Sequence, residues 1–488
     1  RFLAMSSPSD TPAIPGTPPS RWLAGLWVLL LALVAMRLWM MATLPLTDST
    51  EARYGDISRL IVEGGYWLMP HVDPQTPFFA KPAMSFWMSA ISGTLLGVSE
   101  FTLRLPHLLL SLATMGMVWV ATPRLPTLAR TFGMLVFLGA PLSFISAGAV
   151  MTDATQMTFV ALAMLAAWKV LFEGAGRGWL LVFYAAVGLG ALTKGLATIA
   201  LIGLPLTMYA LLGGGVVRTV RALFSVGGVL LFLVIVVPYY AAAEHAYPGF
   251  LKYFIIGEHF KRFLDPAWAG DRYGSAHEEP IGSIWLYWAV SVLPWLAIFL
   301  VQAWRSLRPA AWRAQPAELR YWWSWVLAPL LFFTFTRNLI WTYALTAVPP
   351  FAVIAAHWLA GRSAAQRTRW LAACTLVLLG LYGAAAVYGP PAMEQRSARG
   401  LVRAADRAGR TPDQPIIIRD VYSFSSDYYT RSHAVRESTF EGMAAWLSKP
   451  GTWMIVPNGE VAALQQRDPR VQVLRREDRA SLLHVPAP

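Results

Sequence analysis

The chain has 488 residues, of which 56% are hydrophobic and 14% charged, with 22 tryptophans and a formal net charge of +13. Its mean hydropathy of +0.47, together with several apolar runs near the roughly 20 residues that cross a bilayer, excludes an ordinary soluble domain and predicts a polytopic α-helical membrane protein. The basic residues lie in short loops between the apolar runs and no nucleic-acid motif is present, so we expect no nucleic-acid partner. A single cysteine, Cys374, excludes both a disulfide framework and a cysteine-based metal site.

The chain opens with a segment rich in Ser, Pro and Thr, residues 1–20, which is predicted to be a disordered cytoplasmic tail with Met5 as a candidate start. The first apolar run, 22–41, is too long for a cleaved signal region and is interpreted as a retained signal anchor. Arg37 lies within it, and such a group either snorkels to the nearer interface or faces a polar site.

A long polar passage follows, and its first part has the pattern of a helix. Asp48 stands three residues before Glu51, the spacing of a helix-capping box. Apolar residues recur at intervals of three and four over 51–62, which predicts an amphipathic helix lying flat on a membrane interface. Gly64 and Gly65 are expected to end it.

The second part of the passage places a lysine beside a helix. A proline favours the first helical position, so Pro82 predicts a helix that continues to Gly97. Lys81 then lies beside free helix amides at a membrane surface, which is a candidate site for a lipid phosphate.

The remaining apolar runs define the membrane domain, residues 21–388. Beyond the first, spans are predicted at 103–121, 132–147, 154–172, 179–192, 196–212, 222–240, 284–304, 322–335, 340–360 and 370–388, which makes about eleven spans, or up to about 13 with re-entrant pieces.

Arginines orient these spans. Alternate short loops carry Arg124 and Arg130, Arg177, Arg218 and Arg221, Arg305, Arg308, Arg313 and Arg320, and Arg362, Arg367 and Arg369. The positive-inside rule places these loops and the N-terminus in the cytoplasm. The long loops 44–102 and 241–282 and everything after Gly389 then face outward.

The last hundred residues change character. Short strand-like runs at 415–418, 453–456 and 471–474 alternate with helical patterns at 440–447 and 461–466. Residues 389–488 are therefore predicted to form a small soluble α/β domain outside the membrane, serving as a lid or docking element.

With this orientation, unusual polar residues converge on the outer side: Asp48, Glu51, Arg53, Lys81, Asp153, Lys194, Glu258, His259, Arg262, Arg337 and Tyr343. Each also has a structural interpretation. Asp48 and Glu51 fit a capping box as well as catalysis, and Asp153 follows Thr152 at a helix start as a natural N-cap. Lys81 and Lys194 fit interfacial snorkelling as well as anion binding. Glu258 and His259 fit a solvated loop pair, because no metal-site spacing is spelled out.

These residues carry a resemblance. The sequence DSTEARYGDISRLIVEGGYW followed by FFAKPAMSFWMSA resembles the first outer loop of the protein mannosyltransferase superfamily, and most of all the bacterial lipid A aminoarabinose transferase type. The likeness continues, in the family's order, through GAVMTDATQM, ALTKGLATIALIGLP, IIGEHFKRFL and FTFTRNLIWTYALTAVPP. It implies a GT-C fold that takes a sugar from an undecaprenyl-phosphate carrier at the periplasmic face of a bacterial inner membrane.

The resemblance also implies roles for individual residues. Lys81 matches the lysine that contacts the carrier phosphate, with Arg53, Lys194 and Arg262 as further phosphate-binding candidates. Asp48, Glu51 and Asp153 are the candidate catalytic carboxylates. The remaining positions are expected to line the substrate cavity: Tyr54, Glu258, His259, Arg337 and Tyr343.

The chain departs from the family pattern at three places. Ala80 replaces the glutamate of the Phe-Glu-Lys-Pro form, so a carboxylate that could help to hold a metal or an amino sugar is missing. Thr50 replaces one member of an acidic pair, with an aspartate displaced to Asp48. Asn338 and Leu339 stand where a lysine is often found.

The resulting hypothesis is a membrane glycosyltransferase that moves aminoarabinose, hexosamine or a similar sugar to an envelope acceptor, above all a lipid A phosphate. Its partners would be the lipid-linked donor, the acceptor glycolipid and membrane lipids. We expect no required cofactor, with a divalent metal left open. A protein O-mannosyltransferase-like or other envelope glycan transferase is the alternative enzyme, and a polyprenyl-linked sugar translocator is the alternative from another class, although midplane charges in inverted repeats are not evident.

Overall fold

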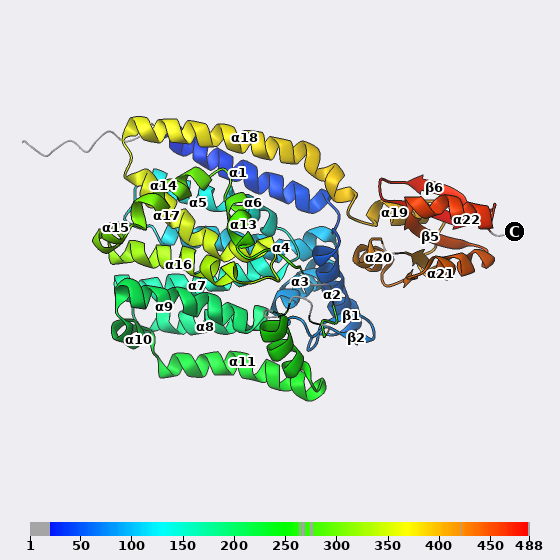
Figure 1. Cartoon of the computed structure of the whole chain (residues 1–488), viewed down its shortest axis with the longest axis horizontal. Coiled ribbons are helices and arrows are strands. Elements are labelled where there is room, and N and C mark those ends of the chain that lie inside the picture. Colours follow the sequence, from blue (N-terminus) through cyan, green and yellow to red (C-terminus); the bar gives the residue numbers. More distant parts are fainter. Residues whose placement is uncertain are drawn as a thin grey trace, which may run out of the picture.

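The computed structural model describes residues 20–262, 265, 268, 270–273, 277–419 and 421–486. Of the tail predicted for residues 1–20, residues 1–19, Met5 included, lie outside the described residues, and Ser20 belongs to a helix. The described chain forms a bundle of long helices side by side, with a small α/β domain beyond one end (Figure 1). We refer to that end of the bundle as the capped end.

The bundle is almost entirely helical. In chain order its elements are α1 (Ser20–Thr43), α3 (Met84–Leu96), α4 (Glu100–Val120), α5 (Thr127–Leu138), α6 (Pro141–Ser146), α7 (Thr152–Glu173), α8 (Arg177–Lys194), α9 (Leu196–Tyr209), the π-helical η1 (Ala210–Gly214), α10 (Val216–Leu223), α11 (Val226–Ala246), α13 (Ser283–Ser291), α14 (Leu296–Ser306), α15 (Pro309–Ala314), α16 (Ala317–Thr334), the 3-10 helix η3 (Trp341–Ala347), α17 (Val348–Ala360) and α18 (Ala364–Glu394). Large aromatic side chains fill its core. Trp288 and Trp295 are at most 1% exposed, so they are core residues and not the interface belt that such tryptophans usually form.

The helices confirm a multi-pass membrane protein. Within the described residues, seven helices are long and apolar enough to cross a membrane, and they coincide with seven of the eleven predicted spans. The other four are helical but shorter, less apolar or broken: 132–147 is divided between α5 and α6, 179–192 is α8, 284–304 is divided between α13 and α14, and 322–335 is α16. The break before α14 contains Pro294, which has no N–H to continue a helix. Arg37 is buried and donates to the Ile145 carbonyl at 2.7 Å, so it does not snorkel.

The polar passage after α1, which we call the first loop (residues 44–102), lies at the capped end. It contains α2 (Thr50–Gly64), a short hairpin of β1 (His71–Asp73) and β2 (Thr76–Pro77), and α3. Gly65 ends α2 in the left-handed conformation, with φ of 76°, as the Gly-Gly pair predicts.

Two predictions about the first loop are wrong. The N-cap of α2 is Ser49 and no side chain caps the helix, so Asp48 and Glu51 do not form a capping box. The polar face of α2 does not lie on a membrane interface either, because Asp56 and Arg59 are each only 3% exposed. The small domain covers this face: Arg59 donates to Ser432 at 2.6 Å.

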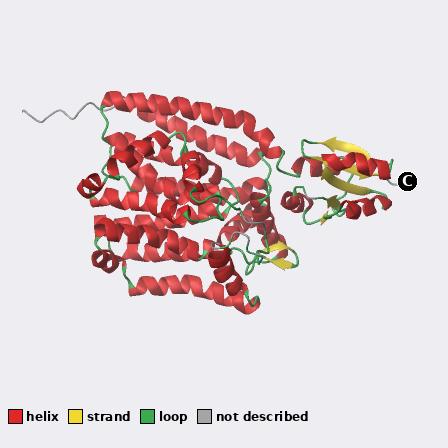
Figure 2. Ribbon diagram, viewed as in Figure 1, coloured by secondary structure: helices red, strands yellow, loops and turns green. Residues whose placement is uncertain are grey.

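The small domain is a five-stranded mixed sheet with helices on both faces (Figure 2). Its elements are α19 (Arg399–Arg407), β3 (Ile416–Ile418), α20 (Ser423–Thr430), β4 (Ala434–Arg436), α21 (Phe440–Ala445), η4 (Trp446–Ser448), β5 (Thr452–Pro457), η5 (Asn458–Glu460), α22 (Val461–Arg467), β6 (Gln472–Arg476) and β7 (Ala480–Val485). The strand order is β4-β3-β5-β7-β6, with β3 parallel to both neighbours and β7 antiparallel to both of its own. A small α/β domain at the C-terminus is thus confirmed, and α18 continues past residue 389 to Glu394 before it begins.

Candidate active site

Two cations meet at one buried carboxylate at the capped end. Lys81, which precedes α3, pairs with Glu258 at 2.8 Å, and Arg262 donates to both oxygens of Glu258 at 3.2 and 3.3 Å. Glu258 lies on the π-helix η2 (Lys252–Lys261), and a second carboxylate, Asp271, lies 3.4 Å from Arg262. Lys81 therefore contacts a carboxylate and the Ala80 carbonyl rather than the helix amides that its position predicts.

The side chains of these two cations are more exposed to solvent than the carboxylate that they contact. The side chain of Glu258 is 4% exposed, whereas those of Lys81 and Arg262 are 21% and 23% exposed. Burial alone would raise the pKa of Glu258, but Lys81 and Arg262 outweigh burial and hold that pKa below its usual value. The carboxylate is thus ionised at neutral pH, and the two cations keep open sides on which an anion can bind.

A second ion pair lies beside the first. Lys194 pairs with Asp153 at 2.8 Å, and both side chains are less than 10% exposed. Asp153 is in the first turn of α7, behind the N-cap Met151, so it is not the N-cap residue. Lys194 is the last residue of α8 rather than a residue at a helix start, and a cation there is favourably placed in the field of the helix. Its amine also lies 5.3 Å from the centre of the Tyr343 ring.

His259 joins the two pairs. Its Nε2 lies 3.0 Å from the Lys194 carbonyl and its Nδ1 lies 2.8 Å from the Phe254 carbonyl. Burial lowers the pKa of His259 in spite of these two hydrogen-bond acceptors. Gly195 permits the close approach: it has φ of 59°, and a Cβ there would lie 2.6 Å from Phe254 and 3.0 Å from His259. We call Lys81, Asp153, Lys194, Glu258, His259, Arg262 and Tyr343 the lysine–carboxylate cluster.

The two candidate catalytic carboxylates of the first loop, Glu51 and Asp48, lie outside this cluster, in separate hydrogen-bond networks. Arg104 forms a bidentate ion pair with Glu51, with N–O distances of 2.8 and 3.0 Å. Arg104 also donates to the carbonyls of Leu44 and Pro45, both at 2.7 Å. Burial alone would raise the pKa of Glu51, but Arg104 outweighs burial and the pKa lies below its usual value.

Asp48 binds the small domain. Its Oδ1 accepts from the backbone amides of Phe424 and Ser425 at 2.9 and 3.2 Å, and its Oδ2 accepts from the Ser425 hydroxyl. Burial raises the pKa of Asp48, and the hydrogen bonds from Ser425 and Phe424 act in the opposite direction. Within the described chain, every hydrogen bond of this carboxylate is therefore with α20.

Arg53 faces residues 271–273, and Tyr54 lies beside it in the first loop. Arg53 donates to the Tyr273 carbonyl, and its guanidinium lies over the rings of Tyr54 and Phe78 at 5.5 and 5.9 Å. Asp271, two residues before Tyr273, lies 3.4 Å from Arg262, so the segment that Arg53 contacts also contacts a cluster residue. Arg53 is thus at the edge of the lysine–carboxylate cluster.

Arg337 is the one predicted site residue that points to the surface. Its side chain is 56% exposed and pairs with Glu278, 59% exposed, at 2.9 Å. The next residue, Asn338, is 8% exposed and donates to the Arg262 carbonyl at 3.4 Å. Asn338 therefore holds the backbone of a cluster residue, although sequence reasoning noted it only as a departure from the family.

Sequence reasoning missed Arg104, Asp271 and Phe424. Arg104 had a usable signal, because an arginine inside an apolar helix needs a buried partner. Asp271 and Phe424 had none: Asp271 stands outside the i,i+3 and i,i+4 spacings of a helix from its partner Arg262, and Phe424 lies in another domain from its partner Arg53. Among the residues that the structure describes, no group of three or more His, Cys, Asp or Glu side chains could hold a metal ion.

The helical bundle with a small α/β domain at one end gives the chain a GT-C-like membrane fold. Residues 80–241 match the family described as dolichyl-phosphate-mannose-protein mannosyltransferase. The fold is similar to that of ArnT from Cupriavidus metallidurans bound to undecaprenyl phosphate, with a TM-score of 0.76 and 19% identity over 95% of this chain and 99% of that one. The apo structure of the same protein gives a TM-score of 0.75.

The curated relatives to which the chain is similar share one name. The chain is 28% identical to an undecaprenyl phosphate-alpha-4-amino-4-deoxy-L-arabinose arabinosyl transferase of Serratia proteamaculans over 74% of this chain, and 29% identical to a protein of the same name from Pseudomonas aeruginosa PAO1 over 68% of this chain. These matches cover 64% and 60% of the two relatives' own lengths. The predicted resemblance to the protein mannosyltransferase superfamily and to its aminoarabinose transferases is confirmed.

Proposed function

We propose that the protein transfers a sugar, aminoarabinose or one of similar chemistry, from undecaprenyl phosphate to an envelope acceptor, most of all a phosphate of lipid A. One observation carries the proposal: Lys81 and Arg262 converge on Glu258 while keeping exposed sides at the capped end. A lipid-linked phosphate that enters from the membrane meets two cations there, which a neutral site would not provide.

The proposed reaction is a displacement at the anomeric carbon. An acceptor oxygen forms a new C–O bond, and the old bond to the carrier phosphate breaks with its electron pair on the departing phosphate oxygen. Negative charge therefore grows on that phosphate, and Lys81 and Arg262, with Arg53 and Lys194 nearby, stabilise it. As in the family it resembles, we propose that the configuration at this carbon inverts.

The carboxylates favour a phosphate acceptor over a hydroxyl acceptor. A hydroxyl must lose a proton to a general base, but Glu51 is held by Arg104, Asp48 by α20 and Asp153 by Lys194. An acceptor phosphate is already ionised and needs no base, so cations matter more than a free carboxylate. For a hydroxyl acceptor on a protein or another envelope glycan, Asp153 would be the candidate base, since it is the one of the three that lies in the cluster.

The cluster supplies its own positive charge, and we propose that transfer needs no cofactor. Dialysis against EDTA tests this directly. Treated protein is expected to keep its activity, and a loss that Mg²⁺, Mn²⁺ or Zn²⁺ restores would reveal a required metal.

We further propose that the capped end and the small domain face the periplasm, with the N-terminus in the cytoplasm. The support is the arginine bias: loops such as the one with Arg305, Arg308 and Arg313 lie at the opposite end of the bundle (Figure 1). The donor then approaches from the outer leaflet of the inner membrane, and nucleic acid has no place among the partners.

The test uses purified full-length protein in lipid nanodiscs with undecaprenyl-phosphate-aminoarabinose as donor. Lipid A with its phosphates is expected to gain the sugar, and enzymatically dephosphorylated lipid A is not. Equal transfer to both would favour a hydroxyl acceptor. Movement of intact donor between leaflets of a proteoliposome, without transfer, would favour the translocator.

A further inference from the structure

The small domain reaches the first loop through the start of α20. A helix leaves its first backbone amides without partners, and a carboxylate that accepts from them caps the helix. For α20 this carboxylate is Asp48, which accepts from the amides of Phe424 and Ser425 although it lies 376 residues before Phe424. The residue preceding α20, Tyr422, provides no side-chain cap. The first loop therefore caps a helix of another domain.

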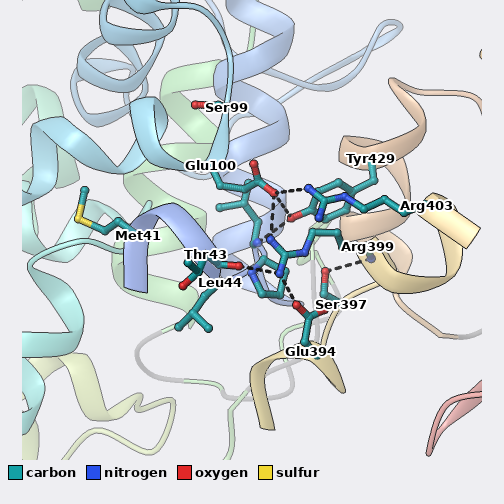
Figure 3. A network of polar contacts seen from close by, with 12 residues as sticks. Met41, Thr43, Leu44, Ser99, Glu100, Glu394, Ser397, Arg399, Arg403 and Tyr429 are labelled. Carbon is teal, nitrogen blue, oxygen red and sulfur yellow. Dashed lines mark hydrogen bonds and ion pairs between the residues drawn. The ribbon is translucent and has the colours of Figure 1, made fainter. Parts of the chain in front are cut away.

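Further contacts fix the position of α20 against the first loop. The Tyr429 hydroxyl accepts from the Leu46 amide at 2.8 Å and donates to Glu100 at 3.2 Å. Figure 3 shows Tyr429 next to Arg399, which binds the Thr43 carbonyl at 2.7 Å, Glu100 at 3.4 Å and also Glu394. The ends of α1, α4 and α18 are thus tied together where the small domain begins.

The start of α20 also meets a residue of the candidate site. The Phe424 ring lies 5.1 Å from the Arg53 guanidinium, and it is the closest of the three rings that flank this cation. Arg53 Nε is buried and has no hydrogen-bond partner within the described part of the chain, and the single hydrogen bond of its side chain there runs to the Tyr273 carbonyl. Among the described residues, Arg53 therefore keeps guanidinium N–H groups that no protein acceptor uses, and aromatic rings rather than a carboxylate contact it.

We propose that Asp48 is a positioning residue, which holds Phe424 at the start of α20 so that Phe424 can hold Arg53 for the donor phosphate. The activity readout of this proposal rests on the proposed function, but its binding readout does not. The small domain becomes part of the donor site, and the displaced aspartate of the first loop serves that domain instead of removing a proton.

Replacing Asp48 with asparagine distinguishes a positioning role of this residue from a role in proton transfer. The asparagine side-chain carbonyl still accepts from the Phe424 and Ser425 amides, but it takes no proton. We expect Asp48→Asn to bind undecaprenyl phosphate within about 3-fold of wild type, because an asparagine cap is about as good as an aspartate cap. Asp48→Ala and Phe424→Ala are each expected to weaken this binding by about 5- to 10-fold through the loss of the aromatic contact to Arg53, with kcat changed far less than the donor KM.

The coupling to Arg53 is tested in a double-variant cycle. In an Arg53→Ala background, Phe424→Ala is expected to cause no further loss of undecaprenyl phosphate binding. Ser432→Ala is the matched control, because it removes the contact between Arg59 and the segment after α20 without touching Phe424. Ser432→Ala is expected to lower thermal stability while leaving undecaprenyl phosphate binding unchanged. If Asp48 had a merely structural role, Asp48→Ala would behave in the same way.

The outcomes are separable. A loss of kcat of more than about 100-fold in Asp48→Asn, with undecaprenyl phosphate binding intact, would make Asp48 catalytic and overturn the proposal. Additive losses from Phe424→Ala and Arg53→Ala, or full binding in Asp48→Ala, would overturn it as well. If wild-type protein binds undecaprenyl phosphate but transfers no sugar, the proposed function fails while the binding series still decides the role of Asp48.

Discussion

Lys81 and Glu258 are separated by 177 residues in the sequence, yet their side chains form an ion pair of 2.8 Å at the capped end of the bundle. Glu258 holds Arg262 at the same time, so one buried carboxylate sets the spacing of two partly exposed cations. A phosphate that binds both cations shares them with Glu258 and does not have to assemble them.

Lys81→Ala is expected to lower the rate of sugar transfer by about 100-fold or more, because prepositioned charge at a developing anion typically contributes that much. The measurement is kcat/KM with purified protein and lipid A. Lys252→Ala, which alters an exposed lysine at the start of the same π-helix that carries Glu258, is the control and should retain wild-type activity. Wild-type activity in Lys81→Ala would remove Lys81 from the donor site.

Breaking the pair of Arg104 and Glu51 should destabilise the protein. Arg104→Ala leaves Glu51, whose side chain is only 12% exposed, without its partner. Removing one member of a buried ion pair costs roughly 3–5 kcal/mol, so the Tm in detergent is expected to fall clearly. The matched control is Arg337→Ala, since the exposed Arg337–Glu278 pair contributes about 1 kcal/mol or less. Similar shifts in the two variants would show that Arg104 does not anchor the first loop.

The contact between α2 and α20 should strengthen in acid. Burial raises the pKa of Asp56 to about 6 and that of Asp427 to about 7, against the opposing effect of Arg59 and Arg436 respectively. Separated, both carboxyls would return to ordinary values near 4. Between about pH 4 and 7 the docked state, in which α20 packs on α2, therefore binds more protons than the separated state. As the pH rises through this range, each of the two carboxyls weakens the contact by at most about 1.4 kcal/mol per pH unit.

Hydrogen exchange of residues 50–64 and 423–430 between pH 5 and 8, corrected for the intrinsic exchange rate, measures this effect. Protection is expected to be greatest near pH 5 and to fall toward pH 8. Asp427→Asn, which stays neutral throughout, should flatten the dependence. Protection that rises with pH would contradict the assignment of a protonated Asp427 to the docked state.

The orientation of the bundle can be tested with single cysteines, because the only native cysteine, Cys374, is buried. In a Cys374→Ala background, Glu441→Cys in the small domain should react with a membrane-impermeant maleimide in cells whose outer membrane has been permeabilised. Arg313→Cys, in a loop at the other end of the bundle, should react only after the inner membrane is opened. The reverse pattern would invert the proposed topology.

Local patterns predicted much of this fold. Apolar length located the long spans, the Gly64–Gly65 pair ended α2 as expected, and β-branched runs located β3, β5 and β6. The strands β4 and β7 were missed, the first because Ala434–Arg436 is too short for a pattern and the second because its apolar run follows directly on a charged stretch. Breaks such as that before α14 reduced the number of helices long enough to span the membrane.

The sequence predicted the cations of the candidate site together with Asp153 and Glu258, but it misplaced Asp48 and Glu51. Resemblance and the sidedness of the loops brought together Lys81, Lys194 and Arg262, which the structure places in or beside the same cluster. The spacing of Asp48 and Glu51 suggested a local capping box, but their partners are Ser425 and Arg104. Spacing reports only neighbours in sequence, so a partner in another domain is invisible to it.

The most direct test of the proposed function is mass spectrometry of lipid A from host cells with the gene intact, deleted, and restored as wild type or as Lys81→Ala. The lipid A phosphates are expected to carry a sugar increment that disappears on deletion, returns with the wild-type gene and stays absent with Lys81→Ala. Lipid A of identical mass in all four strains would contradict this expectation and would direct the search to a protein or polysaccharide acceptor.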